Sequence, residues 1–140
     1  DAGFDILVAD LAEKAPDKLA TNFAARSAKF AYFQCDIADL PAHQRMVEAA
    51  INAFGHIDCL VNNAGVSAVV RGDLLDLKPE NFDRALNINL RGTVFLSQAV
   101  AKAMLATPAV SARSIITITS VSAEMASPER ADYCVSKAGL

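Results

Sequence analysis

The hydrophobic and polar positions of the chain separate into short apolar runs and longer stretches with helical spacing. Apolar runs of this length, bounded by polar turn residues, are typical of buried strands. They occupy residues 4–9, 29–34, 57–61 and 114–119. The intervening stretches predict helices over residues 15–25, 41–54, 79–105 and from Ser127 to the chain end. Strands and helices that alternate in this way predict an α/β fold with a parallel sheet.

Turn-forming residues mark where several of these helices begin or end. Pro41 and Pro79 stand at the starts of two helices, where the missing proline N–H leaves no helical bond unmade. Gly55 is a natural C-cap for the first of them. Ser127 is a candidate N-cap with Pro128 at the first helical position, so we expect the last helix to begin there.

The composition describes one globular domain without an obvious charged or lipid partner. The chain has 140 residues, of which 53% are hydrophobic, so we expect a sizeable core. The net charge of −3 is spread along the chain, which argues against a nucleic-acid or membrane-surface partner. No apolar run approaches the length of a membrane span, and no signal-peptide pattern is present, so the expected location is the cytoplasm.

Cysteines and histidines give no sign of a disulfide framework or a metal site. The three cysteines are odd in number and widely spaced, at Cys35, Cys59 and Cys134. Cys59 is expected inside a buried strand, and Cys134 is expected to be an ordinary small residue on a helix. His43 and His56 are interpreted as surface or element-end residues, so no metal is expected.

The segment Tyr133-Cys134-Val135-Ser136-Lys137 places a phenol and an ammonium four residues apart. On a helix, side chains at this spacing lie one above the other on the same face. The positive charge of the lysine favours the phenolate form of the tyrosine. The pair is therefore a candidate acid and base for moving a proton to or from an alcohol or carbonyl oxygen. Taken alone, an ordinary helix is the better interpretation, because the spacing arises easily by chance.

Three other features precede this pair at characteristic intervals. The tetrapeptide Asn62-Asn63-Ala64-Gly65 follows an apolar run. Asn89 lies in the sequence N-I-N-L-R-G inside an expected helix, where asparagine is a poor helix former. Ser120 ends the run S-I-I-T-I-T-S, thirteen residues before Tyr133. In this order the motifs resemble the short-chain dehydrogenase/reductase family over the whole chain, and most of all its bacterial 3-oxoacyl-[acyl-carrier-protein] reductase-like branch.

The resemblance implies a catalytic tetrad, which consists of Asn89, Ser120, Tyr133 and Lys137. In the family the tyrosine handles the proton, the lysine also holds the nicotinamide ribose, and the serine orients the substrate oxygen. The asparagine marks a helix kink, and a bound water there links the backbone carbonyl to the lysine. The N-L-x-G context selects Asn89 over Asn87, and the thirteen-residue interval selects Ser120 over its two rivals, Thr119 and Ser122.

The resemblance also implies a bound nicotinamide dinucleotide. Asp10 ends the first strand, where a carboxylate accepts hydrogen bonds from ribose hydroxyls and repels a 2′-phosphate, which favours NAD(H). NADP(H) is the alternative cofactor, and helix capping is the alternative role of Asp10. Asp36 either meets the adenine beside the Ile37 backbone or serves as a turn residue, and the two roles are compatible. The predicted cofactor-binding residues are Asp10, Leu11, Asp36, Ile37, Asn62, Ala64, Gly65, Tyr133 and Lys137.

The sequence contains no glycine-rich turn of the kind that cradles a pyrophosphate. Its first strand therefore corresponds to the second strand of a Rossmann-type doubly wound parallel sheet with helices on both faces. The strand that would precede it belongs at the centre of such a sheet, so we expect the sheet here to be incomplete and split. Residues 1–140 are interpreted as part of a single dinucleotide-binding catalytic domain of a longer protein.

The predicted function is that of an NAD(P)(H)-dependent oxidoreductase, which interconverts a ketone and a secondary alcohol by hydride transfer. The substrate would be a small-molecule or acyl-carrier-bound carbonyl compound. Alternatives are a sugar, polyol or other secondary-alcohol dehydrogenase of the same family, an isomerase or dehydratase, and a non-catalytic nucleotide-binding scaffold. The helix over residues 79–105 is apolar on more than one face, and the resemblance implies a homodimer or homotetramer.

Overall fold

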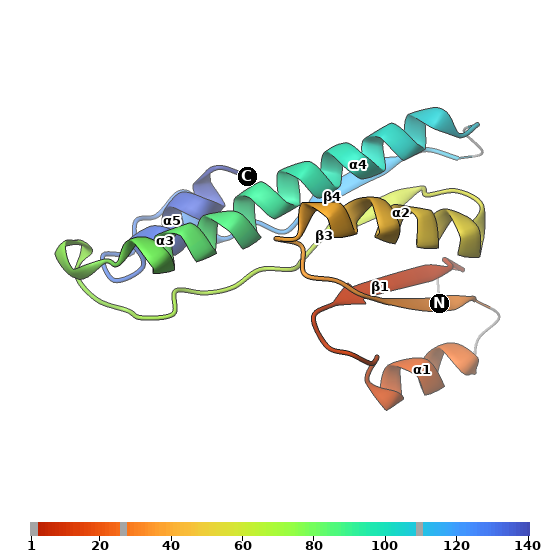
Figure 1. Cartoon of the computed structure of the whole chain (residues 1–140), viewed down its shortest axis with the longest axis horizontal. Coiled ribbons are helices and arrows are strands. Elements are labelled where there is room, and N and C mark those ends of the chain that lie inside the picture. Colours follow the sequence, from red (N-terminus) through yellow and green to blue (C-terminus); the bar gives the residue numbers. More distant parts are fainter. Residues whose placement is uncertain (1–2, 26–27, 109–110) are drawn as a thin grey trace.

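Two pairs of parallel strands frame the structure (Figure 1). A computed structural model describes residues 3–25, 28–108 and 111–140 of the chain. In it, β1 (Ile6–Asp10) pairs with β2 (Phe30–Gln34), and β3 (Cys59–Asn62) pairs with β4 (Ser114–Thr117). Within these described ranges no ladder of hydrogen bonds joins the two pairs. The prediction of a parallel α/β arrangement with a split sheet is therefore confirmed.

Helices lie on both sides of the first strand pair. In Figure 1, α1 (Asp17–Ala24) is on one side of β1 and β2, and α2 (Leu40–Phe54) is on the other. Pro41 occupies the second position of α2, and Gly55 ends it with a φ of 88°, a backbone conformation that glycine adopts without strain. These two predicted boundaries are confirmed.

The long helix predicted over residues 79–105 is present but has an irregular centre. It consists of α3 (Pro79–Ala85), a π-helical segment (Leu86–Gly92) and α4 (Thr93–Ala106), which follow one another without a break. We call residues Leu86–Gly92 the π segment. Its wider turn matters because π-helical turns are rare and are found frequently at functional sites.

The last helix begins later than predicted. α5 spans Ala131–Ala138, so the expectation that Ser127 caps it was wrong. The Arg130 N–H donates to the Ser127 carbonyl at 3.1 Å and closes a separate turn before the helix. The Ser127 hydroxyl accepts from Arg130 Nε at 3.2 Å, within this turn and outside the helix.

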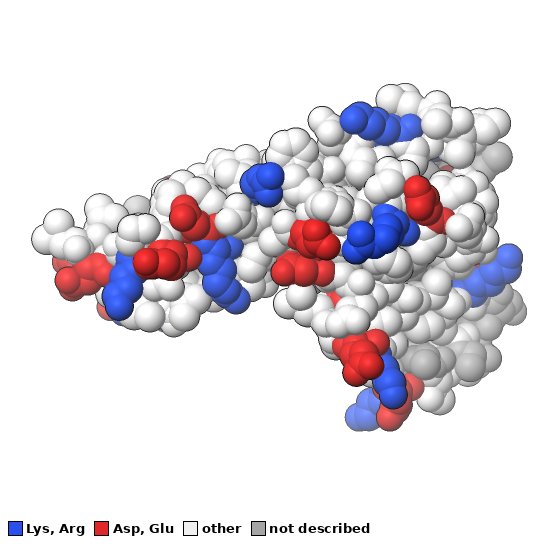
Figure 2. Space-filling view, viewed as in Figure 1, with Lys and Arg blue, Asp and Glu red and all other residues white. Residues whose placement is uncertain are grey.

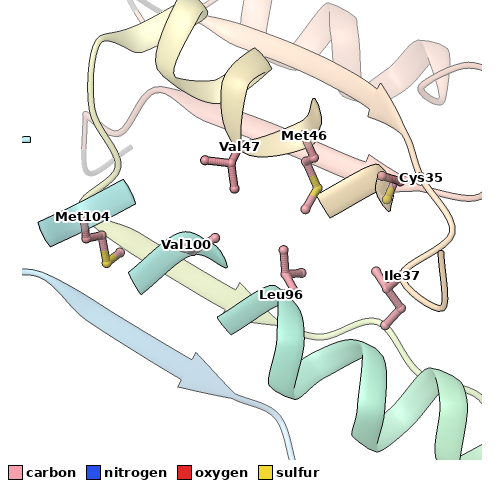
Figure 3. Packing of buried hydrophobic residues seen from close by; sticks show 8 residues of the cluster. Cys35, Ile37, Met46, Val47, Leu96, Val100 and Met104 are labelled. Carbon is pink, nitrogen blue, oxygen red and sulfur yellow. The ribbon is translucent and has the colours of Figure 1, made fainter. Parts of the chain in front are cut away.

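The hydrophobic core lies between α2 and α4, close to the ends of the strands (Figure 3). Met46 and Val47 on α2 face Leu96 and Val100 on α4 across this core. Burial of an aliphatic side chain of this size stabilises a fold by about 1.5–3 kcal/mol. This packing fixes α4, and with it the adjoining π segment, relative to the loop that follows β2.

The strands are less buried than their apolar sequences predict. Val61 on β3 is 54% exposed and Ile116 on β4 is 47% exposed, and Cys59 is only half-buried. The expectation of fully buried strands was therefore wrong for this chain. The physical reason is that each described sheet has two strands, so that strand edges and part of each face have no neighbour.

The two histidines differ from each other. His56 follows α2 and lies 3.0 Å from Asp58 through Nε2 and Oδ2, as expected for a residue at the end of an element. His43 is only 3% exposed, so the expectation of a surface residue was wrong. Its Nε2 donates to the Ile37 carbonyl at 2.8 Å, and this bond satisfies the imidazole inside the core.

Candidate active site

Asn89 joins the π segment to the turn after β3 and to α5. Its side chain is fully buried, with an exposed fraction of 0%. Oδ1 accepts from the Val66 N–H at 2.7 Å, and Nδ2 donates to the Val66 carbonyl at 2.9 Å. Nδ2 also donates to the Ser136 hydroxyl at 2.9 Å. The amide therefore uses both its oxygen and its nitrogen to hold three separate pieces of chain together.

Ser136 continues this network and was not singled out by sequence reasoning. It is 0% exposed, and its hydroxyl donates to the Tyr133 carbonyl at 2.8 Å while it accepts from Asn89. The hydroxyl is thus saturated by partners on both sides. Ser136 fixes the helix turn that carries Tyr133 relative to the π segment. The available sequence signal was a hydroxyl on the residue directly before Lys137.

Lys137 brings an ammonium into the same region. The residue is 7% exposed, and its Nζ donates to the Ile118 carbonyl at 2.9 Å. No ion pair of Lys137 with a carboxylate occurs among the described residues. An ammonium has three N–H donors, so two are left for further acceptors. A buried cation with unused donors is costly unless acceptors reach it, and ribose hydroxyls would meet that requirement.

Gly65 provides the space beside Lys137. A Cβ atom at this position would stand 3.1 Å from Asn89 Oδ1 and 3.7 Å from Lys137 Nζ. The glycine is needed for this close approach, since any side chain would press against the Asn89 amide. The turn predicted at residues 62–65, the π segment and α5 therefore meet. This arrangement fits a nicotinamide ribose. Gly65 leaves space, the Lys137 ammonium has two free donors, and the Asn89 amide is held rigidly beside them.

Tyr133 and Ser120 lie on elements that pack against each other. Tyr133 is half-buried on α5, and its N–H donates to Asp132 Oδ1 at 2.8 Å. Ser120 follows β4 and begins the short 3-10 turn Val121–Ala123, which contacts α5. Its hydroxyl accepts from the Ser122 N–H at 3.2 Å. Ser122 itself is 5% exposed, so of the two serines Ser120 is the one more open to a substrate.

Asn62 differs from the rest of the turn because its side chain holds neighbouring elements together. It ends β3, is 7% exposed, and its Nδ2 donates to Ser97 Oγ at 2.8 Å and Thr117 Oγ1 at 3.3 Å. The amide therefore ties β3 to α4 and β4. Its Oδ1 is buried and has no hydrogen-bond partner within the described part of the chain. Ala64, two residues on, is exposed at the carboxyl end of the strand, where ligands bind in open α/β sheets.

Asp10 lies at the carboxyl end of β1, on a short segment held by side chains of β2. Its Oδ1 accepts from the Ala12 N–H at 3.1 Å, so it closes a local turn, whereas α1 does not begin until Asp17. The Tyr32 hydroxyl donates to the Ala12 carbonyl at 2.7 Å. Desolvation, and then the charge of Asp10, raise the pKa of Tyr32 and so favour the protonated phenol that donates this bond. Leu11 is 62% exposed beside this carboxylate.

The segment after β2, which contains Asp36 and Ile37, is also held by hydrogen bonds. Asp36 is exposed, and its Oδ1 accepts from the Ala38 N–H at 2.9 Å, which is the turn role considered for it. Ile37 is 9% exposed, and its carbonyl accepts from His43. A Cβ atom on Gly92, the last residue of the π segment, would stand 2.5 Å from that carbonyl oxygen. The backbone at Ile37, where the adenine is predicted to bind, therefore packs directly against the π segment. The adenine contact itself stays a prediction.

Neither the surface charge nor the arrangement of metal-binding residues in the described ranges indicates a further ligand for the site. On the face shown in Figure 2, Lys and Arg are interspersed with Asp and Glu, and no area of one sign stands out. In the described ranges, no group of three or more His, Cys, Asp or Glu residues is arranged to hold a metal ion. A search of the same ranges finds no helix with the length and apolar character needed to cross a membrane.

Comparisons with known proteins agree with the fold. The family model described as short chain dehydrogenase matches residues 1–140. The chain is 52% identical to a 3-oxoacyl-[acyl-carrier protein] reductase from Brucella melitensis solved in complex with NAD, with a TM-score of 0.91 over 97% of this chain and 53% of that one. It is 29% identical to a gluconate 5-dehydrogenase from Burkholderia cenocepacia J2315 solved with NADP and tartrate, with a TM-score of 0.81 over 95% of this chain and 50% of that one.

Among curated sequences, the sepiapterin reductase of Chlorobaculum tepidum is 39% identical over 123 residues, which make up 88% of this chain and 48% of that protein. The chain spans about half the length of the curated relatives it matches. The three similar proteins carry different substrate names, and the two solved complexes hold different nucleotides.

Proposed function

Because the chain belongs to the short-chain dehydrogenase family, we propose that its protein is an NAD(P)(H)-dependent oxidoreductase that interconverts a ketone and a secondary alcohol. The observation that carries this proposal is the buried Lys137 ammonium, placed beside Gly65 and Asn89 and four residues after Tyr133. A bound nicotinamide nucleotide would supply or accept the hydride. The chain itself has to hold the nucleotide, orient the oxygen and move the proton.

Tyr133 is the proposed acid and base. Its phenol is on a helix whose orientation is fixed by Ser136 and Asn89, so its position relative to the turn after β3 is rigid. Ser120, on the adjoining 3-10 turn, is proposed to hold the substrate oxygen next to the phenol. Positioned proton transfer of this kind contributes about 10²- to 10⁴-fold to a rate.

Lys137 and Asn89 are proposed to act through position and charge. The two free N–H groups of Lys137 would donate to ribose hydroxyl oxygens, while its third donor stays on the Ile118 carbonyl. The hydrogen bonds of the Asn89 side chain support a positioning role, because the amide is fully occupied by Val66 and Ser136. The water expected at Asn89 would bind the backbone carbonyl, which these bonds do not involve, so that role stays a prediction.

For the nucleotide, we propose a preference for NAD(H) that comes from Asp10. The carboxylate is exposed at the carboxyl end of β1, and the backbone that follows it is fixed by Tyr32. One oxygen is used by the Ala12 N–H, which leaves the other for a ribose hydroxyl. A 2′-phosphate at the same place would meet a like charge. Support from similar proteins is divided, since one solved neighbour holds NAD and another NADP.

For the substrate, a 3-oxoacyl-[acyl-carrier-protein] reductase-like activity is favoured by the 52% identity to the Brucella protein. A sugar or polyol dehydrogenase is the alternative, in line with the gluconate 5-dehydrogenase similarity. We also propose a cytoplasmic homodimer or homotetramer. The support for assembly is the exposed apolar side of α4, where Val94 is 48% and Phe95 is 40% exposed.

The test is NADH and NADPH oxidation across a panel of ketones by the protein expressed from its complete reading frame. Tyr133→Phe is expected to lower kcat by about 10²- to 10⁴-fold and to leave nucleotide binding intact. Tyr32→Phe is the matched control, because it removes the other phenol of the chain and should change the KM for nucleotide more than kcat. Near-normal turnover of Tyr133→Phe would remove Tyr133 from the mechanism, and no oxidation with any ketone would favour a non-catalytic role.

A further inference from the structure

Arg130 places a second positive charge against Tyr133. It is the residue before α5, and its guanidinium carbon lies 5.5 Å from the centroid of the Tyr133 ring. Its Nε donates to the Ser127 hydroxyl at 3.2 Å, so the side chain is held from two directions. The residue is half-buried. Arg130 therefore presents a fixed guanidinium beside the phenol that we propose as the acid and base.

The outer part of this guanidinium has no partner of its own. Neither terminal nitrogen makes a hydrogen bond or an ion pair with any residue in the described ranges. The neighbouring carboxylates do not neutralise it: Glu129 is exposed and unpaired there, and Asp132 Oδ1 accepts the Tyr133 N–H. A guanidinium fork with free terminal N–H groups matches the two oxygens of a carboxylate.

We propose that Arg130 binds a carboxylate of the substrate and selects oxo acids and hydroxy acids over their neutral analogues. This inference rests on the proposed oxidoreductase function, because it places the carboxylate a few bonds from the carbonyl that Tyr133 protonates. It favours a free oxo acid over the acyl-carrier substrate considered above, whose thioester has no carboxylate beside the carbonyl. The guanidinium carbon lies 5.5 Å from the centroid of the Tyr133 ring, so we place the bound carboxylate on the same side of the site as the phenol. A short oxo acid, with its two functional groups one or two carbons apart, spans that gap.

An alternative role for Arg130 is electrostatic. Its charge would then act on the Tyr133 phenol whatever the substrate, and would affect charged and neutral ketones alike. The two roles differ in one measurable quantity, which is the ratio of kcat/KM for an oxo acid to that for its methyl ester. Substrate recognition changes this ratio, and an effect on the phenol does not.

The experiment uses the protein expressed from its complete reading frame, with 3-oxobutanoate and pyruvate each compared with its methyl ester. We expect the parent protein to favour at least one acid over its ester by about tenfold to a hundredfold in kcat/KM, the size of a charge-assisted hydrogen bond. Arg130→Gln should abolish this preference, because it lowers kcat/KM for the acid far more than for the ester. Arg130→Lys should restore part of it, since a lysine keeps the charge but loses the fork. Arg84→Gln, an exposed arginine on α3, is the matched control and should keep the preference.

The possible outcomes separate the two proposals. If the parent protein reduces esters and acids equally well, the inference about Arg130 is wrong and the proposed oxidoreductase function stands. If Arg130→Gln slows both members of a pair to the same extent, or shifts the pH profile with the ester, the arginine acts on Tyr133 and the inference is again wrong. If no ketone, acid or ester, is reduced with either nucleotide, the proposed function fails and the inference fails with it.

Discussion

At the scale of single residues, the site is built from polar groups whose buried bonds leave a few donors and acceptors unused. Asn89 and Ser136 are saturated by protein partners and act as spacers between elements. Two N–H donors of Lys137 and the terminal nitrogens of Arg130 have no hydrogen-bond partner in the described ranges, and neither cation is paired with a carboxylate there. Since an unused buried donor is costly, the free donors of Lys137 point to a ligand, and the half-buried Arg130 guanidinium offers further donors to a substrate.

The exposed carboxylate of Asp10 leads to a prediction about nucleotide choice. A hydrogen bond from a ribose hydroxyl to a carboxylate is worth about 1.5–3 kcal/mol. The protein from its complete reading frame should therefore prefer NADH over NADPH by about tenfold to a hundredfold in kcat/KM. Asp10→Ala should shrink this preference, mainly by weakening the use of NADH, whereas Asp83→Ala on α3 should not change it. A clear preference for NADPH in the unmodified protein would show that Asp10 serves only the turn at Ala12.

Which residues could be recognised from the sequence depended on whether their partners are near in sequence. Tyr133 and Lys137 were recognised from their four-residue spacing together with the motifs upstream, and both lie on α5. Asn89 was found because an asparagine within a helix contradicts local propensity. Ser136 and His43 were missed, because their partners, Asn89 and the Ile37 carbonyl, are supplied by other elements. A buried histidine in particular looks like a surface residue until its acceptor is known.

At the scale of elements, the π segment is the centre of the arrangement. It contacts α5 through Asn89 and the segment after β2 through Gly92, so one irregular turn supports both the predicted ribose position and the predicted adenine position. The apolar pattern could not show it, although the family resemblance implied a helix kink at Asn89. Residues 79–105 have the apolar spacing of one long helix, and a single widened turn does not alter which residues are apolar.

Gly92 offers a test of this arrangement. A Cβ atom there would meet the Ile37 carbonyl oxygen at 2.5 Å and the Asn87 carbonyl oxygen at 3.2 Å, and both are backbone atoms that cannot rotate away. Gly92→Ala should therefore destabilise the protein by about 1–3 kcal/mol, as overpacking does. It should also weaken nucleotide binding, because Ile37 must move. Urea unfolding and titration with nucleotide measure the two effects.

The control for Gly92 is another glycine with space around it. A Cβ atom on Gly72 would have no atom within 4 Å, and the backbone there does not require a glycine. Gly72→Ala should change the free energy of unfolding by no more than about 0.5 kcal/mol. Equal stability of the two variants would show that the segment after β2 yields easily, and the π segment would then not be a rigid support.

At the scale of the whole molecule, the structure has a well-buried hydrophobic core between α2 and α4 and, in the described residues, two two-stranded sheets. In this core, residues such as Val100 and Met46 are almost fully buried. The sheets are different. Each described sheet has two strands, and the alternation of elements predicted the fold class without showing how much strand surface would be left open. That quantity depends on neighbours in space, which a pattern along one chain does not contain.

This open surface predicts how the 140-residue chain behaves when it is expressed by itself. Val61, Ile115 and Ile116 on β3 and β4 are 54%, 40% and 47% exposed, and a two-stranded sheet is marginally stable in water. The isolated chain should therefore bind the dye 1-anilinonaphthalene-8-sulfonate and unfold over a broad temperature range, because the sheets can loosen while the core between α2 and α4 persists. The protein from its complete reading frame, measured beside it, should unfold in a sharp transition that NADH raises. A sharp calorimetric transition of the isolated chain, with equal calorimetric and van't Hoff enthalpies and a further increase in Tm with NADH, would contradict this prediction. It would mean that the helices alone hold both strand pairs in place, despite the exposed isoleucines.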